Sequence, residues 1–510
     1  MASTVYSFAI SGIDGYVVEV ETETLNGLPS VSIVGLGDKG VKEAKERLEA
    51  AIRHANYLFP PQKVVFNLAP SDMKKAGTHF DLAMAIGLLI RTNQIQVPSL
   101  QKVGFIGELS LNSTIRPVSG VLPMVMKAKE ARITKLFVAR ENVAEARLVK
   151  GIEVVGCEKL QDVIQFLNGG QQVCSVNDEN SSEDLPFYKD LDFKDVKGQS
   201  LLIEFLAIAA AGGHNFLMIG PPGAGKSMIA KRIPSILPNM TEEESLEVMK
   251  IYSVANLLKT KCALLTERPF RAPHHNASTN SLIGGGTYAR PGEISLAHNG
   301  VLFLDEMGEF SRKSLDSLRQ PLEDKSVTIT RVWGSNTYPA NFMLVGAMNP
   351  CPCGYFGQEK CRCTDYEILK YRQKLSGPIM DRMDIQKYVG IVDFFDEDLQ
   401  GKSSREIRIV MEKARKLQQE RFRDVPSINC NAQMTSAHID RFCRLDSGTI
   451  SLLRVAAERF QYSGRAIHKY IKIARTIADM EESEDIRYEH MRKSLLSRDL
   501  EKDKLAFIRR

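Results

Sequence analysis

The amino-acid sequence predicts a multidomain α/β protein with an α+β front domain, an α/β core around a glycine-rich loop, and an all-α C-terminal domain. Three observations predict this fold class. The loop at 220–227 lies between a short apolar run and the start of a helical pattern, as in parallel α/β sheets. A second apolar run at 301–304 ends in two carboxylates, where such sheets place their ligands. Beyond residue 400, apolar residues recur at helical spacing.

The glycine-rich loop matches the phosphate-binding pattern G-x-x-x-x-G-K-[ST] at every position. Its residues are Gly220, Pro221, Pro222, Gly223, Ala224, Gly225, Lys226 and Ser227. Glycines let the backbone turn its N–H groups toward a phosphate, and the N-terminus of the following helix adds a favourable dipole. We expect Lys226 to reach the β- and γ-phosphates and Ser227 to ligate Mg²⁺. The loop therefore predicts binding of a nucleoside triphosphate.

Residues 1–167 predict an α+β front domain. Alternating or apolar runs predict strands, and apolar residues three and four positions apart predict helices. The predicted strands are 16–23, 30–34, 63–68, 103–111 and 135–139, and the predicted helices are 38–54, 80–90 and 122–131. Residues 168–189 are rich in Gly, Gln, Asn, Ser and acidic residues, so we expect a linker there.

Residues 190–400 are the predicted core, with a helix at 200–211 and strands at 215–219, 300–304 and 342–348. The strand at 300–304 delivers Asp305 and Glu306. We expect Asp305 to hold Mg²⁺, directly or through water, and Glu306 to polarise the attacking water. Asn349 follows the strand at 342–348. The core resembles motor ATPases in which this position orients water against the γ-phosphate, and the resemblance implies that role for the Asn349 amide.

The C-terminal residues 401–510 predict helices at 405–420, 437–442, 447–460, 464–480 and 487–496. This part carries 24 Lys and Arg against 16 Asp and Glu, whereas the chain as a whole has a net charge of only +5. A basic surface of this kind permits contact with nucleic acid. A solvated helical surface would have a similar composition, and both interpretations stay open.

Composition excludes several other classes of protein. The chain of 510 residues is 43% hydrophobic and 25% charged, as expected for a globular protein of roughly three domains. No apolar run approaches the ~18–20 residues of a membrane span. Residues 1–10 lack the charged and apolar segments of a signal peptide. Nine cysteines, four of them within 13 residues, do not resemble a secreted disulfide framework. We therefore expect a cytoplasmic protein without a membrane partner.

The core resembles ATPases of the AAA+ class, and further motifs resemble one branch of it closely. These motifs are 270–275 (FRAPHH), 284–286 (GGG), 290–300 (RPGEISLAHNG) and 349–354 (NPCPCG). They resemble the bacterial YifB/ComM family, a magnesium-chelatase-like branch of AAA+ ATPases, and the resemblance covers essentially the whole chain. It implies an ATP- and Mg²⁺-dependent hexameric ring that translocates on DNA, with a branch-migration role in recombination of incoming DNA. It also implies that the C-terminal helices form the lid of the motor.

The same resemblance implies roles for two arginines. Arg382 lies between acidic residues in 376–384 (SGPIMDRMD), where an arginine of this class reaches the γ-phosphate bound by a neighbouring subunit. A salt bridge with Asp381 or Asp384 is the alternative. Arg465, at the start of the predicted helix 464–480, resembles the second sensor, which reports on the nucleotide from the lid.

The front domain resembles the Lon-protease-like domain, especially at 107–111 and 117–131. Proteolysis there requires a serine activated by a lysine. This chain has His79 at the aligned serine position and Met124 near the lysine position. Thr78 beside His79 suggests a nucleophile and a base, but we favour ordinary residues at a helix start, with Thr78 as the cap. We therefore expect the fold without its protease.

Residues 266–292 separate the two nucleotide motifs by more than an αβ unit requires. In this class such insertions form hairpins that face the pore of the ring. Arg271, His274, His275 and Arg290 are therefore candidates for contacts with DNA phosphates. For the adjacent histidines, a packed turn is an equal alternative.

Cys351, Cys353, Cys361 and Cys363 give the spacing C-x-C-x₇-C-x-C. Four thiolates of this kind could close a tetrahedral Zn²⁺ site that staples an irregular loop. The single residue inside each pair departs from the usual gap of two to four, so reduced metal-free thiols and a disulfide remain alternatives.

Two rival functions stay open at this point. One is the motor subunit of a magnesium chelatase, which would not need the front domain. The other is an ATP-dependent Lon-like peptidase, which the absent serine–lysine pair disfavours.

Overall fold

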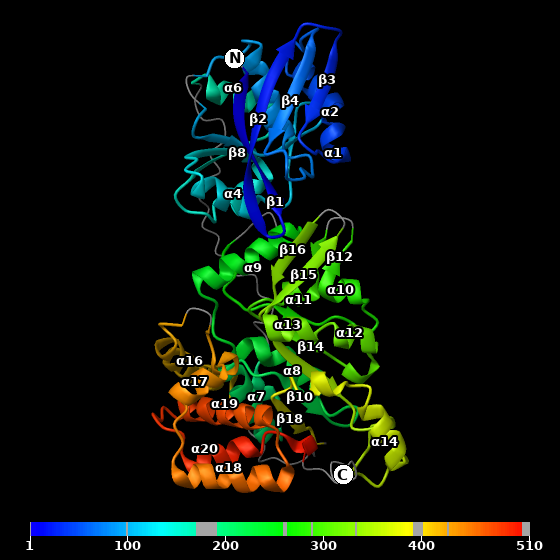
Figure 1. Cartoon of the computed structure of the whole chain (residues 1–510), viewed down its shortest axis with the longest axis vertical. Coiled ribbons are helices and arrows are strands. Elements are labelled where there is room, and N and C mark those ends of the chain that lie inside the picture. The colour runs from blue at the N-terminus through cyan, green and yellow to red at the C-terminus, as the bar shows by residue number, and fades with distance from the viewer. Residues whose placement is uncertain are drawn as a thin grey trace.

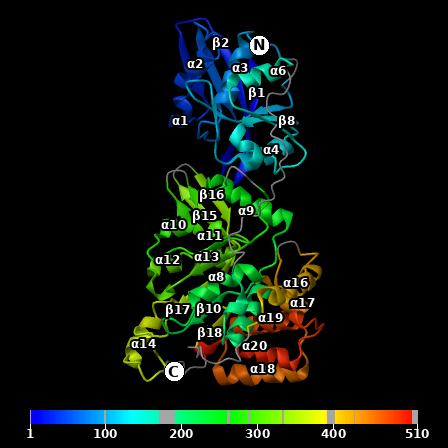
Figure 2. The same cartoon turned by 180° about the vertical axis from the view of Figure 1, so that it is seen from behind.

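The computed structural model describes residues 2–97, 100–169, 191–258, 263–286, 289–331, 334–390, 401–425 and 428–501. The molecule is elongated. The front region (2–169) lies at one end, the central region (191–390) follows, and the C-terminal helices (401–501) flank the far end of the central region (Figure 1). Seen from behind, the C-terminal helices keep to one side of the central region (Figure 2).

The front region is built on a mixed seven-stranded sheet with the order β3-β4-β2-β1-β5-β8-β9. Strands β1, β2 and β4 are antiparallel neighbours, and the remaining pairs are parallel. Helix α3 is apolar almost throughout and is buried over the middle of the sheet. The strands are β1 (Ser3–Ser11), β2 (Asp14–Leu25), β3 (Ser30–Val34), β4 (Lys63–Ala69), β5 (Val103–Phe105), β8 (Lys135–Ala139) and β9 (Glu153–Cys157), with a small pair β6 (Glu108–Leu109) and β7 (Ile115–Arg116); the helices are α1 (Lys39–Lys42), α2 (Ala44–His54), α3 (Asp81–Arg91), α4 (Val121–Glu130), α5 (Val143–Ala146) and α6 (Leu160–Leu167).

Several expectations for the front region need correction. The helix expected at 38–54 is two helices, because α1 begins at the side-chain cap of Asp38 and ends at Lys42. The strand expected at 103–111 is divided into β5 and β6. Strand β1 was not predicted, although its residues alternate between buried and partly exposed positions over much of its length.

The central region contains a five-stranded, all-parallel sheet with the order β11-β14-β17-β10-β18. Every residue of β10, β14 and β17 is buried, as expected for strands covered on both faces. The strands of this sheet are β10 (Phe216–Ile219), β11 (Phe270–Arg271), β14 (Val301–Leu304), β17 (Met343–Met348) and β18 (Ile385–Tyr388); the helices are α7 (Ser200–Gly212), α8 (Lys226–Ile236), α9 (Glu242–Val254), α10 (Thr279–Ile283), α11 (Glu293–Leu296), α12 (Arg312–Asp316), α13 (Arg319–Asp324), α14 (Asp365–Arg372) and α15 (Gly377–Met380).

Two antiparallel hairpins extend from the central region. One pairs β12 (Gly284–Gly285) with β13 (Arg290–Pro291), and the other pairs β15 (Ser326–Arg331) with β16 (Gly334–Pro339). Figure 1 shows both at the end of the central region that faces the front region.

The C-terminal part is helical, as predicted. Its helices are α16 (Ser404–Arg421), α17 (Ser436–Phe442), α18 (Ser447–Phe460), α19 (Gly464–Met480) and α20 (Tyr488–Leu495). Helix α19 is amphipathic, and its apolar side joins two hydrophobic clusters: one with α7 and the central sheet, the other among the C-terminal helices. Short 3₁₀ turns complete the described elements at Arg140–Asn142, Phe193–Asp195, Met307–Glu309, Asn431–Gln433 and Asp499–Glu501.

Helix α9 connects the front and central regions, because α4 packs against it. The buried carboxylate of Glu145 accepts hydrogen bonds from the Leu122 backbone N–H at 2.9 Å and from the Ser253 hydroxyl. The Gly120 backbone N–H donates to the Ser253 carbonyl at 3.2 Å. Ser253 thus carries polar contacts from two points of the front region.

The α/β class with a parallel sheet is confirmed, whereas the domain boundaries at 167, 190 and 400 remain predictions. All but the first two residues of the predicted linker 168–189 lie outside the described residues, as do residues 391–400. No helix in the described part of the chain has the length and hydropathy required to span a membrane.

Candidate nucleotide-binding site

The strand order brings the predicted nucleotide residues together. Strands β14, β17 and β10 are neighbours and run parallel, so their carboxyl ends share one edge of the sheet. Asp305 follows β14, Asn349 follows β17, and the glycine-rich loop follows β10. Segments separated by about 130 residues of sequence therefore meet at this edge.

The loop has the backbone conformation that its glycines permit. Gly223 and Gly225 adopt left-handed φ values of 79° and 83°, which residues with a side chain rarely adopt. Lys226 begins α8, and its ammonium group donates to the carbonyl oxygens of Gly220 at 2.6 Å and Pro221 at 2.8 Å. The same ammonium group donates to Asn349 Oδ1 at 3.3 Å. The loop, Lys226 and Asn349 thus form one connected cluster.

Ser227 and Asp305 also meet. The Ser227 hydroxyl donates to Asp305 Oδ2 at 2.5 Å. A hydroxyl and a carboxylate oxygen side by side are the hard oxygen donors that Mg²⁺ prefers, so these two residues fit the ion that the motif predicts. Burial lowers the pKa of Lys226, while the nearby carboxylates of Asp305 and Glu306 oppose that shift. Positive and negative groups therefore balance each other around the loop.

Glu306 has an unexpected partner. Its φ is 48°, a conformation uncommon outside glycine, and its carboxylate pairs with His275 Nδ1 at 3.1 Å. His275 follows β11, the edge strand that lies next to β14 on the side away from β10. The pair therefore links the Glu306 carboxylate to the segment that follows the edge strand β11.

Arg382 and Arg465 lie away from the loop. The Arg382 carbonyl accepts a hydrogen bond from the Asn215 amide at 2.9 Å, and Asn215 precedes β10, so Arg382 lies at the amino edge of the sheet. Its guanidinium forms an ion pair with Glu323 rather than with the neighbouring Asp381 or Asp384. Burial lowers the pKa of Arg382, and the nearby charges of Arg465 and Arg319 add to this shift. Arg465 also lines a pocket of about 870 Å³ with Asp381 and Lys469.

The four candidate DNA contacts separate into two groups. Arg271 makes a two-pronged ion pair with Glu293 at 2.7 and 2.8 Å, and His275 pairs with Glu306, so these two side chains are engaged inside the protein. His274 packs on the His275 ring at 4.1 Å. Arg290 is exposed on the β12–β13 hairpin. Arg331 of the adjacent hairpin is also exposed, with its guanidinium close to Gly285.

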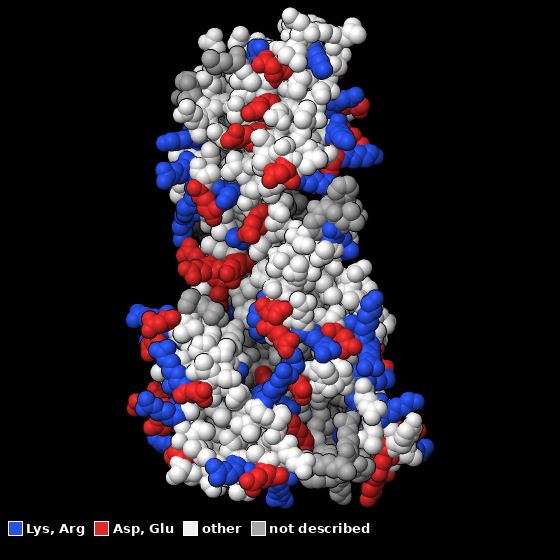
Figure 3. All heavy atoms as spheres, viewed as in Figure 1, with Lys and Arg blue, Asp and Glu red and all other residues white. Residues whose placement is uncertain are grey.

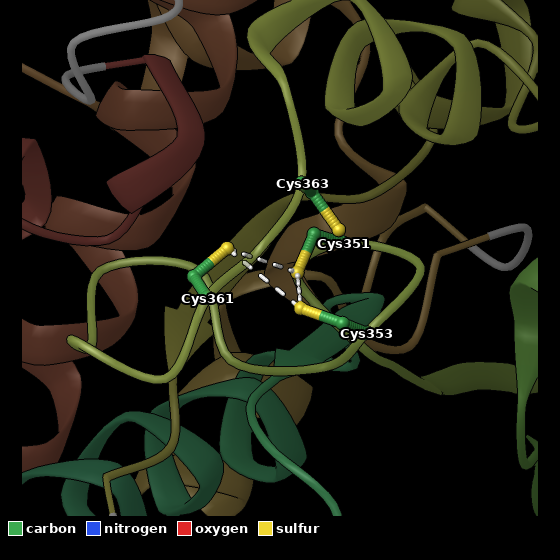
Figure 4. A group of neighbouring side chains, drawn as sticks. All are labelled: Cys351, Cys353, Cys361 and Cys363. Carbon is green, nitrogen blue, oxygen red and sulfur yellow. Dashed lines mark hydrogen bonds between the residues drawn. The ribbon is translucent and has the colours of Figure 1, made fainter.

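The four predicted cysteines meet in space (Figure 4). Their sulfur atoms all lie within 4.8 Å of one another, and three of the separations are 3.4 Å (Cys351–Cys353), 3.7 Å (Cys353–Cys361) and 3.9 Å (Cys351–Cys361). Cys363 completes the group from the segment that enters α14. Hydrogen bonds from the Tyr355 and Arg362 backbone N–H groups lower the pKa of the Cys353 thiol to about 6.

The front region places Thr78 and His79 at a helix start, but Thr78 does not cap the helix. Helix α3 begins at Asp81, and its N-cap is Phe80. The Thr78 hydroxyl donates to Glu108. His79 is buried against Phe80, burial lowers its pKa to about 4, and its Nε2 has no hydrogen-bond partner. Met124 is fully buried in an apolar cluster.

Sequence reasoning did not find the roles of His275 and Arg331. The FRAPHH motif singles out His275, but the motif alone does not say that β11 lies beside β14. The alternation of Val327, Thr328, Ile329 and Thr330 is a clear strand signal, and it could have predicted the β15–β16 hairpin that carries Arg331.

Comparison with known proteins identifies the family of the chain. Family models described as magnesium chelatase subunit ChlI match residues 192–394 and 20–142, and a model of the ChlI C-terminal part matches residues 401–498. The competence protein ComM of Haemophilus influenzae is 39% identical over 498 residues, 96% of each chain. The uncharacterised YifB of Escherichia coli is 37% identical over 506 residues, 98% of this chain and 97% of YifB. An uncharacterised protein of Mycobacterium tuberculosis is 37% identical over 481 residues, 93% of this chain and 94% of the relative. The chain belongs to the YifB/ComM family of magnesium-chelatase-like AAA+ ATPases.

Proposed function

We propose that this ATPase is a ring-forming motor that moves on DNA and drives branch migration during recombination. The observation that carries the proposal is the convergence of the phosphate-binding loop, Lys226, Ser227, Asp305 and Asn349 at one edge of the central sheet. This constellation holds a nucleoside triphosphate and supplies the groups that its hydrolysis requires.

Each residue at this edge has a role in the proposed reaction. Backbone N–H groups of residues 220–225 and Lys226 hold the phosphates, while Ser227 and Asp305 hold Mg²⁺, which neutralises charge on the β- and γ-phosphates. Glu306 orients and polarises the attacking water once its carboxylate leaves His275. Asn349 positions that water from the end of β17.

The ring is part of the proposal because, within the described residues, the two candidate arginines lie away from the phosphate-binding loop of their own chain. Arg382 and Arg465 lie near each other at the amino edge of the sheet, whereas the loop lies at the carboxyl edge. In a head-to-tail ring, the amino-edge surface of one subunit faces the nucleotide of the next. We place both arginines at the neighbour's γ-phosphate, which Arg382 reaches after leaving Glu323.

Two observations support DNA as the polymer along which the motor moves. Arg290 and Arg331 are exposed on adjacent hairpins of the central region, where they are free to approach phosphates. The relative from Haemophilus influenzae is named a competence protein. Basic and acidic side chains are interspersed over the face shown in Figure 3, so the proposal relies on the hairpins and not on a broad basic surface.

ATP hydrolysis measured with single-stranded, duplex and four-way-junction DNA, at two salt concentrations, tests this proposal. We expect stimulation that is strongest with the four-way junction and falls at the higher salt concentration, because phosphate contacts release counterions. Hydrolysis indifferent to every DNA would overturn the DNA motor. Stimulation by a chelatase partner instead would identify a metal-insertion motor, and degradation of casein would identify a peptidase.

The hairpin arginines provide a sharper measurement. Substituting Arg290→Ala and Arg331→Ala together should reduce the slope of log affinity for DNA against log salt by about 2, because each lost phosphate contact removes roughly one unit. Arg53→Ala is the matched control, since Arg53 is also exposed but lies on α2 of the front region, paired with Glu49. An unchanged slope in the double variant would place the DNA elsewhere.

A further inference from the structure

The cysteine loop (residues 350–363) has almost no hydrophobic core of its own. Its cluster contains two buried side chains, Cys351 and Ile368, and Ile368 belongs to the following helix α14. The loop turns through Gly354 and Gly357, both in the left-handed region with φ near 85°. Local backbone hydrogen bonds close these turns, such as Gly354 N–H to Cys351 O at 3.0 Å. Fourteen residues with so little apolar burial need another source of order.

The sulfur positions match a tetrahedral metal site. With zinc–sulfur bonds of about 2.3 Å, the four sulfurs of such a site lie ~3.8 Å apart. The sulfurs of Cys351, Cys353 and Cys361 lie 3.4, 3.7 and 3.9 Å apart, and Cys363 completes the group within 4.8 Å. A disulfide has a sulfur–sulfur bond of about 2.05 Å, well short of these separations.

The backbone around the sulfurs suits a metal thiolate centre. Cys351 accepts hydrogen bonds from the N–H groups of Phe356 and Gly354, and Cys353 accepts them from Tyr355 and Arg362. Donors of this kind orient ligating sulfurs and stabilise their charge, as the surroundings of metal ligands generally do. The arrangement leaves no obvious opening for a catalytic water, because four protein ligands already fill the four positions that structural zinc uses.

The loop also touches the nucleotide site. A Cβ placed on Gly354 would lie 2.6 Å from Pro222 Cδ, so the loop backbone packs directly on the phosphate-binding loop. Cys351 comes two residues after Asn349, whose amide oxygen accepts from Lys226. A constraint on the positions of the four cysteines would therefore also constrain the positions of Pro222 and Asn349.

We propose that Cys351, Cys353, Cys361 and Cys363 bind one structural Zn²⁺, and that this site braces the phosphate-binding loop and Asn349. The metal site stands on the sulfur geometry alone, whereas the bracing rests on the proposed nucleotide site. Loss of zinc would release the loop from Pro222 and leave Asn349 without a fixed position. ATP would then bind more weakly, although no zinc ligand touches it.

The metal content of the full chain tests the site directly. Protein purified in metal-free buffer should carry about one zinc per chain by mass spectrometry, and growth with cobalt should give the absorption of a tetrahedral cobalt thiolate. Cys353→Ala with Cys361→Ala should reduce zinc to less than about a tenth of that. Cys430→Ala with Cys443→Ala is the matched control and should retain it, because these two cysteines are buried in the C-terminal part of the chain, outside the cysteine loop. A wild-type chain without zinc, or with these cysteines in disulfides, would overturn the site.

Titration with a fluorescent ATP analogue tests the bracing. Wild-type protein stripped of zinc should bind the analogue at least about five times more weakly, and restored zinc should recover the affinity. Affinity unchanged within about twofold would overturn the bracing. Lys226→Ala separates the two proposals, since it should retain zinc and lose nucleotide. A wild-type chain that holds zinc but binds no nucleotide would contradict the proposed function and leave the metal site standing.

Discussion

At the scale of one residue, the contacts of Glu306 depend both on its own motif and on a neighbouring segment. The motif places a carboxylate after β14, and the neighbouring strand supplies His275 as its partner. We expect Glu306→Gln to bind ATP with near wild-type affinity and to lose hydrolysis by roughly 10²–10⁴-fold, because an amide cannot polarise water as a carboxylate does. Lys226→Ala should instead lose binding. Equilibrium binding and single-turnover hydrolysis distinguish the two, and normal turnover by Glu306→Gln would contradict its assignment.

His275 provides a second prediction at this scale. The pair with His275 engages the carboxylate that the proposed reaction needs for polarising water. His275→Ala should therefore raise ATP hydrolysis in the absence of DNA several-fold, with little change in KM. His274→Ala is the control, since the same motif carries it without a bond to Glu306. A reduced rate in His275→Ala would mean that the histidine positions the carboxylate for catalysis.

The convergence of the candidate nucleotide residues could be expected from sequence, because each of them directly follows a buried strand of a parallel sheet. The pattern at 220–227 names each residue, and buried strands precede Asp305 and Asn349. The His275–Glu306 pair could not be predicted in this way, because it depends on strand order, which no local pattern encodes. The same reason left the sulfur geometry open, since C-x-C-x₇-C-x-C fixes only the distances along the chain.

At the scale of elements, the carboxylate of Asp384 joins β10, β18 and α19. It accepts a hydrogen bond from the Asn215 backbone N–H at 3.0 Å, pairs with Lys469 of α19 at 3.3 Å, and lies 3.7 Å from His214. Burial alone would raise the pKa of Asp384, but Lys469, His214 and the Asn215 N–H together hold it well below its ordinary value of 3.8. The folded chain therefore favours the charged carboxylate.

We expect Asp384→Asn to lower the free energy of unfolding by roughly 2–4 kcal/mol at neutral pH, because Lys469 then loses its buried partner. The native pKa is depressed, so this contribution is complete above the ordinary value and is lost as pH falls toward the native value. The difference in thermal midpoint between wild type and variant should be constant from pH 7 to pH 5 and shrink below about pH 4. Asp381→Asn, at an exposed neighbouring position, is the control. A difference that grew in acid would contradict the charge argument.

Helices and strands could be predicted from sequence where a single hydrophobic periodicity ran through the whole segment. The C-terminal helices match their expected ranges closely, because α16 and α19 have long amphipathic patterns. Helix α9 was missed, although Thr241 and Glu244 form a capping box at its start. The helix cap predicted at Thr78 is wrong. A threonine before an apolar run suggests a cap, but the Thr78 hydroxyl donates its hydrogen bond to Glu108, which is distant in sequence.

At the scale of the whole molecule, the two parts of the proposed active site lie at opposite edges of the central sheet. One chain presents the nucleotide loop at the carboxyl edge of its central sheet and Arg382 at the amino edge. Because a single chain cannot place both at one phosphate, catalysis in this proposal belongs to the interface between chains. The sequence could suggest this only by resemblance, since no pattern within one chain records the contacts of a ring.

Mixing two inactive variants tests this shared site. Glu306→Gln loses the water-polarising group of its own site, and Arg382→Ala loses the charge given to the neighbour's site. Each variant alone should hydrolyse ATP at least about 100-fold more slowly than wild type. In an equal mixture that assembles at random, about a quarter of the interfaces combine an intact Glu306 with an intact Arg382, because the two residues come from different subunits of a head-to-tail ring. The mixture should therefore regain up to about a quarter of the wild-type rate.

The control is a mixture of the double variant Glu306→Gln/Arg382→Ala with Glu306→Gln. It contains no intact Glu306 and should stay inactive. A mixture as inactive as its components, although gel filtration shows that they assemble together, would place Arg382 outside the neighbour's site.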